Sequence, residues 1–310
     1  MGQDDNRSDR LTNLWVGLAR KAPTLARCSS FLPHPNRPID RVAGLARARD
    51  EILTHAAAIT SPEVYARWGT APAVGLLLIG GRGSGKSTLA RALATRLGAP
   101  LLEIDVPQLV LELLTRGAEV AQLVDHWEQL FDEFPKTVIH FDELDFERMH
   151  ETGERKAGLP AGPILEFLLR LVGQTASSKG IVLVGSTSYP QTVRPVFLSR
   201  RRFTRTLKVE PIYPGDHAAV LELHARSAEE RAGRPLFETI DWNAIASARK
   251  GLSPGNWVEA LHGALRCHAR REAIGESPPL VAGKTVLEEA ETLAENARAT
   301  HAEPASGNYL

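Results

Sequence analysis

The residues with the clearest chemistry lie in a glycine-rich stretch at positions 80–88. The stretch fits G-x-x-x-x-G-K-[ST], a pattern in which glycines let successive backbone N–H groups point at phosphate oxygens. Lys86 can then reach the β- and γ-phosphates, and the Ser87 hydroxyl can hold Mg²⁺. The pattern predicts a loop that binds ATP and Mg²⁺, formed by Gly80, Gly81, Arg82, Gly83, Ser84, Gly85, Lys86, Ser87 and Thr88.

Two acids that follow an apolar run form a second candidate group. The run 138–141 reads as a strand and ends directly before Asp142 and Glu143. Side chains just past the carboxyl end of a parallel strand face the ligand crevice. Asp142 is therefore expected to hold Mg²⁺ through water, and Glu143 to orient and polarise the attacking water. His140, within the strand, is expected to pack in the core or behind the acids rather than to react.

These residues must be positioned by a sheet and its helices. Apolar strand-like runs alternate with amphipathic segments, which indicates an α/β fold: a three-layer αβα parallel sheet of the P-loop type, followed by a small α-helical lid domain. An apolar run precedes the glycine-rich stretch and a helical pattern follows it, which argues against a chance glycine-rich turn. The expected strands are 74–79, 101–104, 137–141, 181–185 and 206–209, and the expected helices are 88–97, 216–231, 241–249, 253–272 and 286–297.

The chain divides into four expected parts. Residues 1–37 are interpreted as an N-terminal extension and linker because they end in a proline-rich run. Residues 38–212 form the expected ATPase domain, and 213–275 the helical lid. Residues 276–310 are expected to hold one helix and a flexible tail.

Composition limits the classes of partner. The chain has 310 residues, 43% of them hydrophobic, and Lys+Arg 37 balance Asp+Glu 37. Zero net charge gives no whole-chain attraction to nucleic acid or to a membrane surface. Cys28 and Cys267 show neither metal-ligand spacing nor a disulfide framework, and residues 1–6 do not have the basic and apolar regions expected of a signal peptide. No run approaches membrane-spanning length, so we expect a cytoplasmic protein.

Several further stretches resemble the AAA family of the AAA+ superfamily, over about residues 38–275. Residues 39–45 resemble the family's entry motif, and Asp142-Glu143-Leu144-Asp145 matches its second acidic motif. Residues 184–190 resemble the Thr-Asn-x-Pro sensor segment. The stretch 195–198, followed by Arg202-Phe203-Thr204-Arg205, resembles the second region of homology.

The resemblance implies roles for residues outside the loop. Gly44, in the entry motif, would lie against adenine, and Gly255 would lie beside the nucleotide in a turn of the lid. Ser188 would help to position water as the sensor. Arg202 and Arg205 would be arginine fingers that enter a neighbouring subunit's site, which implies a homo-oligomeric ring, by resemblance a hexamer.

The arginine run leaves other interpretations open. Four arginines lie within residues 199–205, and such a run can also be a solvated turn or a nucleic-acid patch. The neutral chain and the lack of interleaved aromatic residues argue against nucleic acid, which stays the less favoured partner. Fingers are favoured because they neutralise charge that develops in the transition state.

Two departures from the family limit the functional reading. Ser188 stands where the family has Asn, so hydrolysis could be slowed. Residues 109–117 contain no aromatic residue where unfoldases carry a substrate-gripping loop. Leu113 and Leu114 could provide an apolar grip, or 106–114 could simply be a packed helix.

Two functions remain open on this basis. The first is an ATP-hydrolysing ring that remodels a protein substrate or complex. The second is an ATP-dependent switch or scaffold that recruits or loads a protein or DNA partner without threading it through a pore. The intact Glu143 and the paired arginines favour the first, and the missing aromatic residue and Ser188 favour the second.

Overall fold

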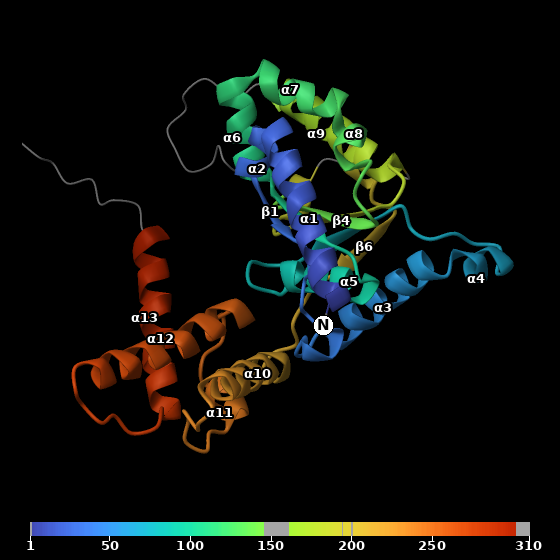
Figure 1. Ribbon diagram of the computed structural model, residues 1–310. Helices are drawn as coiled ribbons and strands as arrows, with labels where there is room; N and C mark the ends of the chain where they lie inside the picture. Colours follow the sequence, from blue (N-terminus) through green and yellow to red (C-terminus); the bar gives the residue numbers. More distant parts are fainter. Residues whose placement is uncertain (1, 146–160, 194, 200, 302–310) are drawn as a thin grey trace, which may run out of the picture. The chain divides into compact units, whose positions relative to one another are not determined.

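The computed structural model describes residues 2–145, 161–193, 195–199 and 201–301 (Figure 1). The chain forms two compact units. The first unit comprises Met1–Val42, Ala46–Gly81 and Lys86–Val209, and the second comprises Ala43–Leu45, Arg82–Gly85 and Glu210–Leu310.

A six-stranded sheet in the order β1-β3-β4-β5-β2-β6 organises the first unit. β1 runs antiparallel to β3, and all the other pairs are parallel. The mostly parallel α/β sheet confirms the expected fold class, and each expected strand is present within a few residues of its expected bounds. The strands are β1 (Ser29–Leu32), β2 (Gly75–Ile79), β3 (Leu101–Asp105), β4 (Thr137–Asp142), β5 (Ile181–Thr187) and β6 (Arg205–Lys208).

Alternation along the strands gives the sheet two different faces. One face contributes Leu102, Ile139 and Leu183 to an apolar core that also contains side chains of α6–α9. The opposite face meets α5, and it carries polar residues in β3, β4 and β5. The helices of this unit that follow β1 are α3 (Ala46–Thr60), α4 (Pro62–Arg67), α5 (Lys86–Leu97), α6 (Val106–Arg116), α7 (Ala118–Asp125), α8 (Trp127–Phe131) and α9 (Ala161–Ser177).

The first 32 residues form structure where the sequence predicted an extension and linker. They make α1 (Gly2–Lys21), α2 (Pro23–Arg27) and the edge strand β1. Leu18, Leu25 and Cys28 are buried in the same apolar core as α6–α9, and Trp15 stacks on Phe31 with ring centroids 5.1 Å apart. The proline-rich run that suggested a linker, residues 32–38, lies at the end of these elements. β1 left no local signal in the sequence because it forms by pairing with β3, which is distant in the chain.

The second unit is helical, as expected for residues after 213. It consists of α10 (Gly215–Ala232), α11 (Trp242–Ala248), α12 (Pro254–Ala273) and α13 (Gly283–His301). Its core surrounds the fully buried Trp257 and includes Val286 and Ala290 of α13. The expected C-terminal helix therefore packs into the helical unit rather than standing apart, and residues 302–310 of the expected tail lie outside the described residues.

Short 3₁₀ turns at Ile39–Arg41, Pro190–Thr192 and Pro195–Leu198 complete the elements that bear on the site. Among the residues that the structure describes, no helix is both long enough and apolar enough to cross a lipid bilayer.

Candidate active site

The glycine-rich loop follows β2 directly and ends where α5 begins, at Lys86. Gly85 has φ 106°, a backbone conformation that side-chain-bearing residues rarely adopt. The buried Lys86 Nζ donates hydrogen bonds to the carbonyl oxygens of Gly80 (2.7 Å) and Gly81 (3.0 Å) and to Ser188 Oγ (3.1 Å). The loop lysine and the expected sensor residue thus meet within one unit.

The loop also contains a buried polar atom that suits an anionic ligand. Ser84 is 6% exposed, and its hydroxyl has no hydrogen-bond partner among the described residues. A buried hydroxyl without a partner is costly, and a phosphate oxygen would accept its hydrogen bond.

Asp142 is the last residue of β4, and its two carboxylate oxygens have different partners. Ser87 Oγ donates to Oδ2 at 3.2 Å. Oδ1 accepts from the Ser186 hydroxyl and, at 3.1 Å, from the Glu143 backbone N–H. Burial raises the pKa of Asp142, but the charge of His140 and the hydroxyl donors outweigh burial, so the pKa lies below its usual value.

The contact between Ser87 and Asp142 fits the expected Mg²⁺. A hydroxyl and an ionised carboxylate are the hard oxygen ligands that Mg²⁺ takes in nucleotide sites. The lowered pKa keeps Asp142 in the charged form that such a site needs. Both residues therefore have the right chemistry and lie together.

Glu143 has a strained backbone. Its φ is 56°, in the left-handed region that is costly for a residue with a side chain. The chain directly after Glu143 is held in place, because the Leu144 N–H donates to the Ser186 carbonyl at 2.9 Å. Strain of this kind clusters at functional sites, where the surrounding structure maintains it. The half-buried Glu143 follows the carboxyl end of β4, where the sequence placed it.

Thr187, at the end of β5, and Ser188, which follows it, make different contacts. The fully buried Thr187 hydroxyl donates to Asp145 Oδ1 at 2.9 Å and accepts from the Tyr189 N–H at 3.0 Å. It is therefore committed to holding the turn after β5. Ser188, through Lys86, is the member of this pair that contacts the loop.

Gly44 and Gly255 lie in the second unit. A Cβ on Gly44 would come within 2.5 Å of the Asp216 side chain, whose Oδ2 accepts from the Leu45 N–H at 3.0 Å. The Gly255 N–H donates to the Gly83 carbonyl at 3.0 Å, and a Cβ there would lie 2.9 Å from Gly83 Cα. Both glycines thus allow close backbone approaches, and their expected contact with a nucleotide stays a prediction.

The two candidate finger arginines are bonded within their own chain. Arg202 donates to the carbonyls of Leu169 and Val196, both at 3.2 Å, and to Ser199 Oγ. Arg205 pairs with Glu51 of α3, and this hydrogen bond lowers the pKa of Glu51. The structure brings Lys86, Ser87, Asp142 and Ser188 together but gives the arginines these other partners. Their action on a neighbouring subunit therefore stays a prediction.

The expected apolar grip falls in a helix. Leu113 and Leu114 belong to α6, whose N-terminus is capped by Asp105 through the Gln108 N–H. Leu113 packs against the apolar core, whereas Leu114 is 38% exposed. Of the two interpretations left open above, the packed helix describes Leu113.

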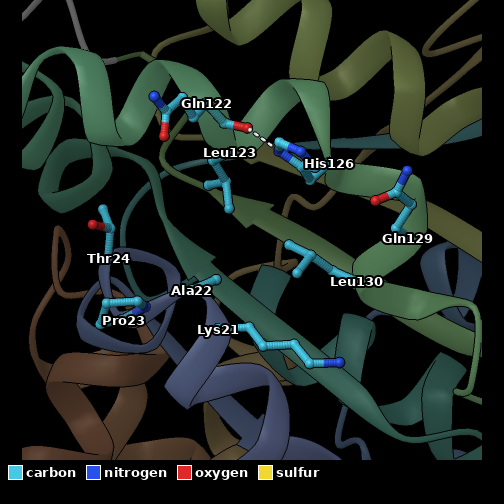
Figure 2. A pocket seen from close by; sticks show the side chains of 9 residues that line it. All are labelled: Lys21, Ala22, Pro23, Thr24, Gln122, Leu123, His126, Gln129 and Leu130. Atoms are coloured by element: carbon cyan, nitrogen blue, oxygen red, sulfur yellow. Dashed lines mark hydrogen bonds between the residues drawn. The ribbon is translucent and has the colours of Figure 1, made fainter.

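A separate cavity of about 500 Å³ lies between the α1–α2 connection and α7–α8 (Figure 2). Figure 2 shows polar side chains around it, with His126 bonded to the Gln122 carbonyl at 3.2 Å. The cavity shares no residue with the loop or with β4, so we assign the phosphate chemistry elsewhere. Its lining is Lys21, Ala22, Pro23, Thr24, Gln122, Leu123, His126, Gln129 and Leu130.

Sequence reasoning missed Ser186 and Asp216. Ser186 lies on a strand that reads as continuous and apolar, so no local pattern distinguishes it. Asp216 accepts from the N–H groups of Leu45 and Ile212, the latter at 2.9 Å. An acid at the start of a helix after Pro-Gly is a signal that could have singled it out.

Comparison with known proteins agrees with this geometry. Residues 76–211 match the model of the ATPase family associated with various cellular activities (AAA). The ATP-dependent zinc metalloprotease FtsH of Acidothermus cellulolyticus is 29% identical over 267 residues, which cover 82% of this chain and 38% of that protein. FtsH of Rubrobacter xylanophilus is 28% identical over 275 residues, covering 87% and 39%.

FtsH of Cutibacterium acnes is 28% identical over 251 residues, which cover 78% of this chain and 33% of that protein. The chain thus spans less than two fifths of the length of these curated relatives. The matched region begins in β2 and ends after β6, so it contains the loop, both acids and the arginine pair. Residues 76–211, which carry these groups, thus match the AAA family of ATPases.

Proposed function

We propose that this protein binds ATP with Mg²⁺ and hydrolyses it at the carboxyl ends of β2, β4 and β5. One observation carries the proposal: the Ser87 hydroxyl, at the start of α5, contacts the Asp142 carboxylate at the end of β4. This pair joins the phosphate loop to the acidic strand, which is the arrangement that phosphoryl transfer from a nucleotide requires.

Each residue has a defined task in this proposal. Lys86 exchanges its bonds with the Gly80 and Gly81 carbonyls for bonds with phosphate oxygens, which are stronger because both partners are charged. Ser87 and Asp142 hold Mg²⁺, which when bound neutralises phosphate charge. Glu143 orients the attacking water and accepts its proton, and Ser188 helps to place that water.

Ring assembly is the second level of the proposal. The relatives are named ATP-dependent proteases, which suggests that ATP-driven work on proteins extends to this chain. We infer a homo-oligomer, by family resemblance a hexamer, in which Arg202 and Arg205 leave their present partners and neutralise phosphate charge in the neighbouring subunit's site.

The switch or scaffold function is retained as a second candidate because of α6. The residues considered for gripping a substrate lie in a regular helix, and Leu113 packs on the core. A ring that binds ATP and recruits a partner, protein or DNA, needs no gripping residue at this position.

Phosphate release by the purified chain tests both levels. We expect turnover that requires Mg²⁺ and whose specific rate rises with protein concentration. Adding an unfolded model protein should stimulate a remodeller, whereas duplex DNA or a native partner should stimulate a switch. An absence of ATP binding by calorimetry would overturn the proposal at its first level, and a full rate in a strict monomer would overturn the ring.

A further inference from the structure

We propose that His140 and Ser186 are positioning residues that hold the Asp142 carboxylate in the orientation that meets Ser87. The inference rests on the proposed function, because it assigns a purpose to the Ser87–Asp142 contact. It deepens that function by naming two residues that lie behind the metal ligands.

The sheet register places these residues on one face. Glu103 of β3 is paired with His140 of β4, and Phe141 is paired with Gly185 of β5, so that Asp142 and Ser186 are neighbours one step further along. Side chains two residues apart on a strand point to the same side. Glu103, His140, Asp142 and Ser186 therefore share the face that α5 covers, opposite the apolar core that contains Ile139 and Phe141.

Helix α5 meets this polar face with two side chains one turn apart. Ser87 contacts Asp142, and Arg91, four residues later, forms a bidentate pair with Glu103, with Nη2–Oε2 at 2.7 Å and Nε–Oε1 at 3.1 Å. Residues at this spacing lie on one side of a helix. Arg91 is thus paired with Glu103, and Asp142 is contacted by Ser87.

His140 separates the two carboxylates. Its side chain is 0% exposed, with Nδ1 3.8 Å from Glu103 Oε1 and Nε2 3.9 Å from Asp142 Oδ1. Neither ring nitrogen has a hydrogen-bond partner among the described residues. A buried polar ring at this position is costly unless it interacts with the adjacent charges, so its placement between two acids points to an electrostatic task.

Ser186 determines which way the carboxylate faces. Its hydroxyl, on the fully buried end of β5, donates to Oδ1 of Asp142. With Oδ1 held by Ser186 and by the Glu143 N–H, Oδ2 is the oxygen presented to Ser87. Hydrogen bonds to a metal ligand from residues behind it commonly change metal affinity by about 10–100-fold.

The experiment measures how much Mg²⁺ strengthens ADP binding, without any need for turnover. Calorimetry gives the ADP dissociation constant with Mg²⁺ and with EDTA, and their ratio is the metal gain. For Ser186→Ala and His140→Gln we expect the ADP dissociation constant in EDTA to stay within about 2-fold of wild type. We expect the metal gain to fall by about 10-fold or more. Ser186→Thr, which keeps the hydroxyl, should recover most of the gain.

Two comparisons separate positioning from general damage. Thr175→Val removes another fully buried hydroxyl, which bonds the Leu171 carbonyl in α9, and should leave the metal gain unchanged. In an Asp142→Asn background, Ser186→Ala should produce no further loss, because it acts through that carboxylate. If His140→Gln does not fold by its melting curve, the Ser186 variants decide the outcome.

The results distinguish the two levels of inference. A full metal gain in Ser186→Ala, together with a lost gain in Asp142→Asn, would overturn the positioning role while keeping the proposed function. An equal loss from Ser186→Ala with and without the Asp142 carboxylate would also overturn it. Wild-type protein that binds no nucleotide would instead refute the proposed function itself.

Discussion

The candidate site and the arginine pair differ in how complete they are within a single chain. At the site, Lys86 contacts Ser188, and Ser87 contacts Asp142. The groups proposed to bind phosphate and metal therefore already lie together in a single chain. Arg202 and Arg205, by contrast, are bonded to the Leu169 carbonyl within α9, to a 3₁₀ turn and to Glu51 of their own chain. In the first region, Lys86 would only exchange two carbonyls of its own loop for phosphate oxygens. The arginines would have to leave partners in separate elements before they could act on a neighbouring subunit.

The difference indicates a division between binding and hydrolysis. A preassembled phosphate loop pays little for ordering when nucleotide arrives, so one subunit should bind alone. The exposed Arg205–Glu51 pair is weak enough to exchange, because surface ion pairs contribute little to stability. Hydrolysis should therefore depend on assembly, whereas binding should not. The following predictions test this division, from the largest expected effect to the smallest.

Arg205→Ala should lower the hydrolysis rate by about 10³-fold or more, because it removes charge that stabilises the transition state. ADP affinity and melting temperature should change little. Arg201→Ala, which removes a neighbouring exposed arginine, is the matched control and should stay close to wild type. Phosphate release and calorimetry provide both measurements.

Mixing two inactive variants tells whether the arginine acts across subunits. Arg205→Ala keeps Glu143, and Glu143→Gln keeps Arg205, so mixed rings should regain turnover above either protein alone. If the mixture stays inactive while both variants assemble, the arginine acts within its own chain and the proposed division is wrong.

Glu143→Gln should slow hydrolysis by about 10²–10⁴-fold, since an amide can contact water but cannot accept its proton. Nucleotide binding should persist, and ATP should hold the assembled state long enough to be seen by light scattering. Wild-type turnover in this variant would remove Glu143 from the role of base.

Lys86→Ala should weaken ATP binding by about two orders of magnitude, the loss expected for a charged hydrogen bond. The effect should be the same in dilute and in concentrated protein, because the contact lies within one subunit. Unchanged affinity by calorimetry would contradict the assignment of the phosphate loop.

Single serine substitutions in α6 separate core from surface. Leu113→Ser removes a side chain packed on the core and should lower the free energy of unfolding by about 1–3 kcal/mol. Leu114→Ser changes a 38% exposed residue and should cost less than about 0.5 kcal/mol. Equal melting temperatures for both variants would place Leu113 outside the core. That result would again favour contact between these leucines and a protein substrate.

Local patterns in the sequence predicted most elements of the fold. The strands β2–β5 were recognisable because buried parallel strands read as short apolar runs. β1 was not, since Ser29–Leu32 becomes a strand through its pairing with β3. The helix α13 was expected, but its place in the core around Trp257 depends on helices that lie earlier in the chain.

The phosphate loop and the Asp142–Glu143 pair were determined by the sequence alone. Their chemistry depends on residue types at fixed spacing, and any fold that continues a strand into a helix at Lys86 builds the same loop. The contact between Lys86 and Ser188 was open to prediction only through the family resemblance, because it joins the start of α5 to the residue after β5.

Only the tertiary structure showed which residues lie behind the proposed metal ligands. Glu103, His140 and Ser186 come from three different strands. The sequence placed His140 in the core or behind the acids, but it did not show its neighbours, and Glu103 and Ser186 have no local signature. Sheet register brings them to one face under α5, where burial turns ordinary side chains into strong electrostatic partners. Sequence spacing identifies the reacting groups because catalysis constrains their types, whereas the groups that orient them are decided by which strands become neighbours.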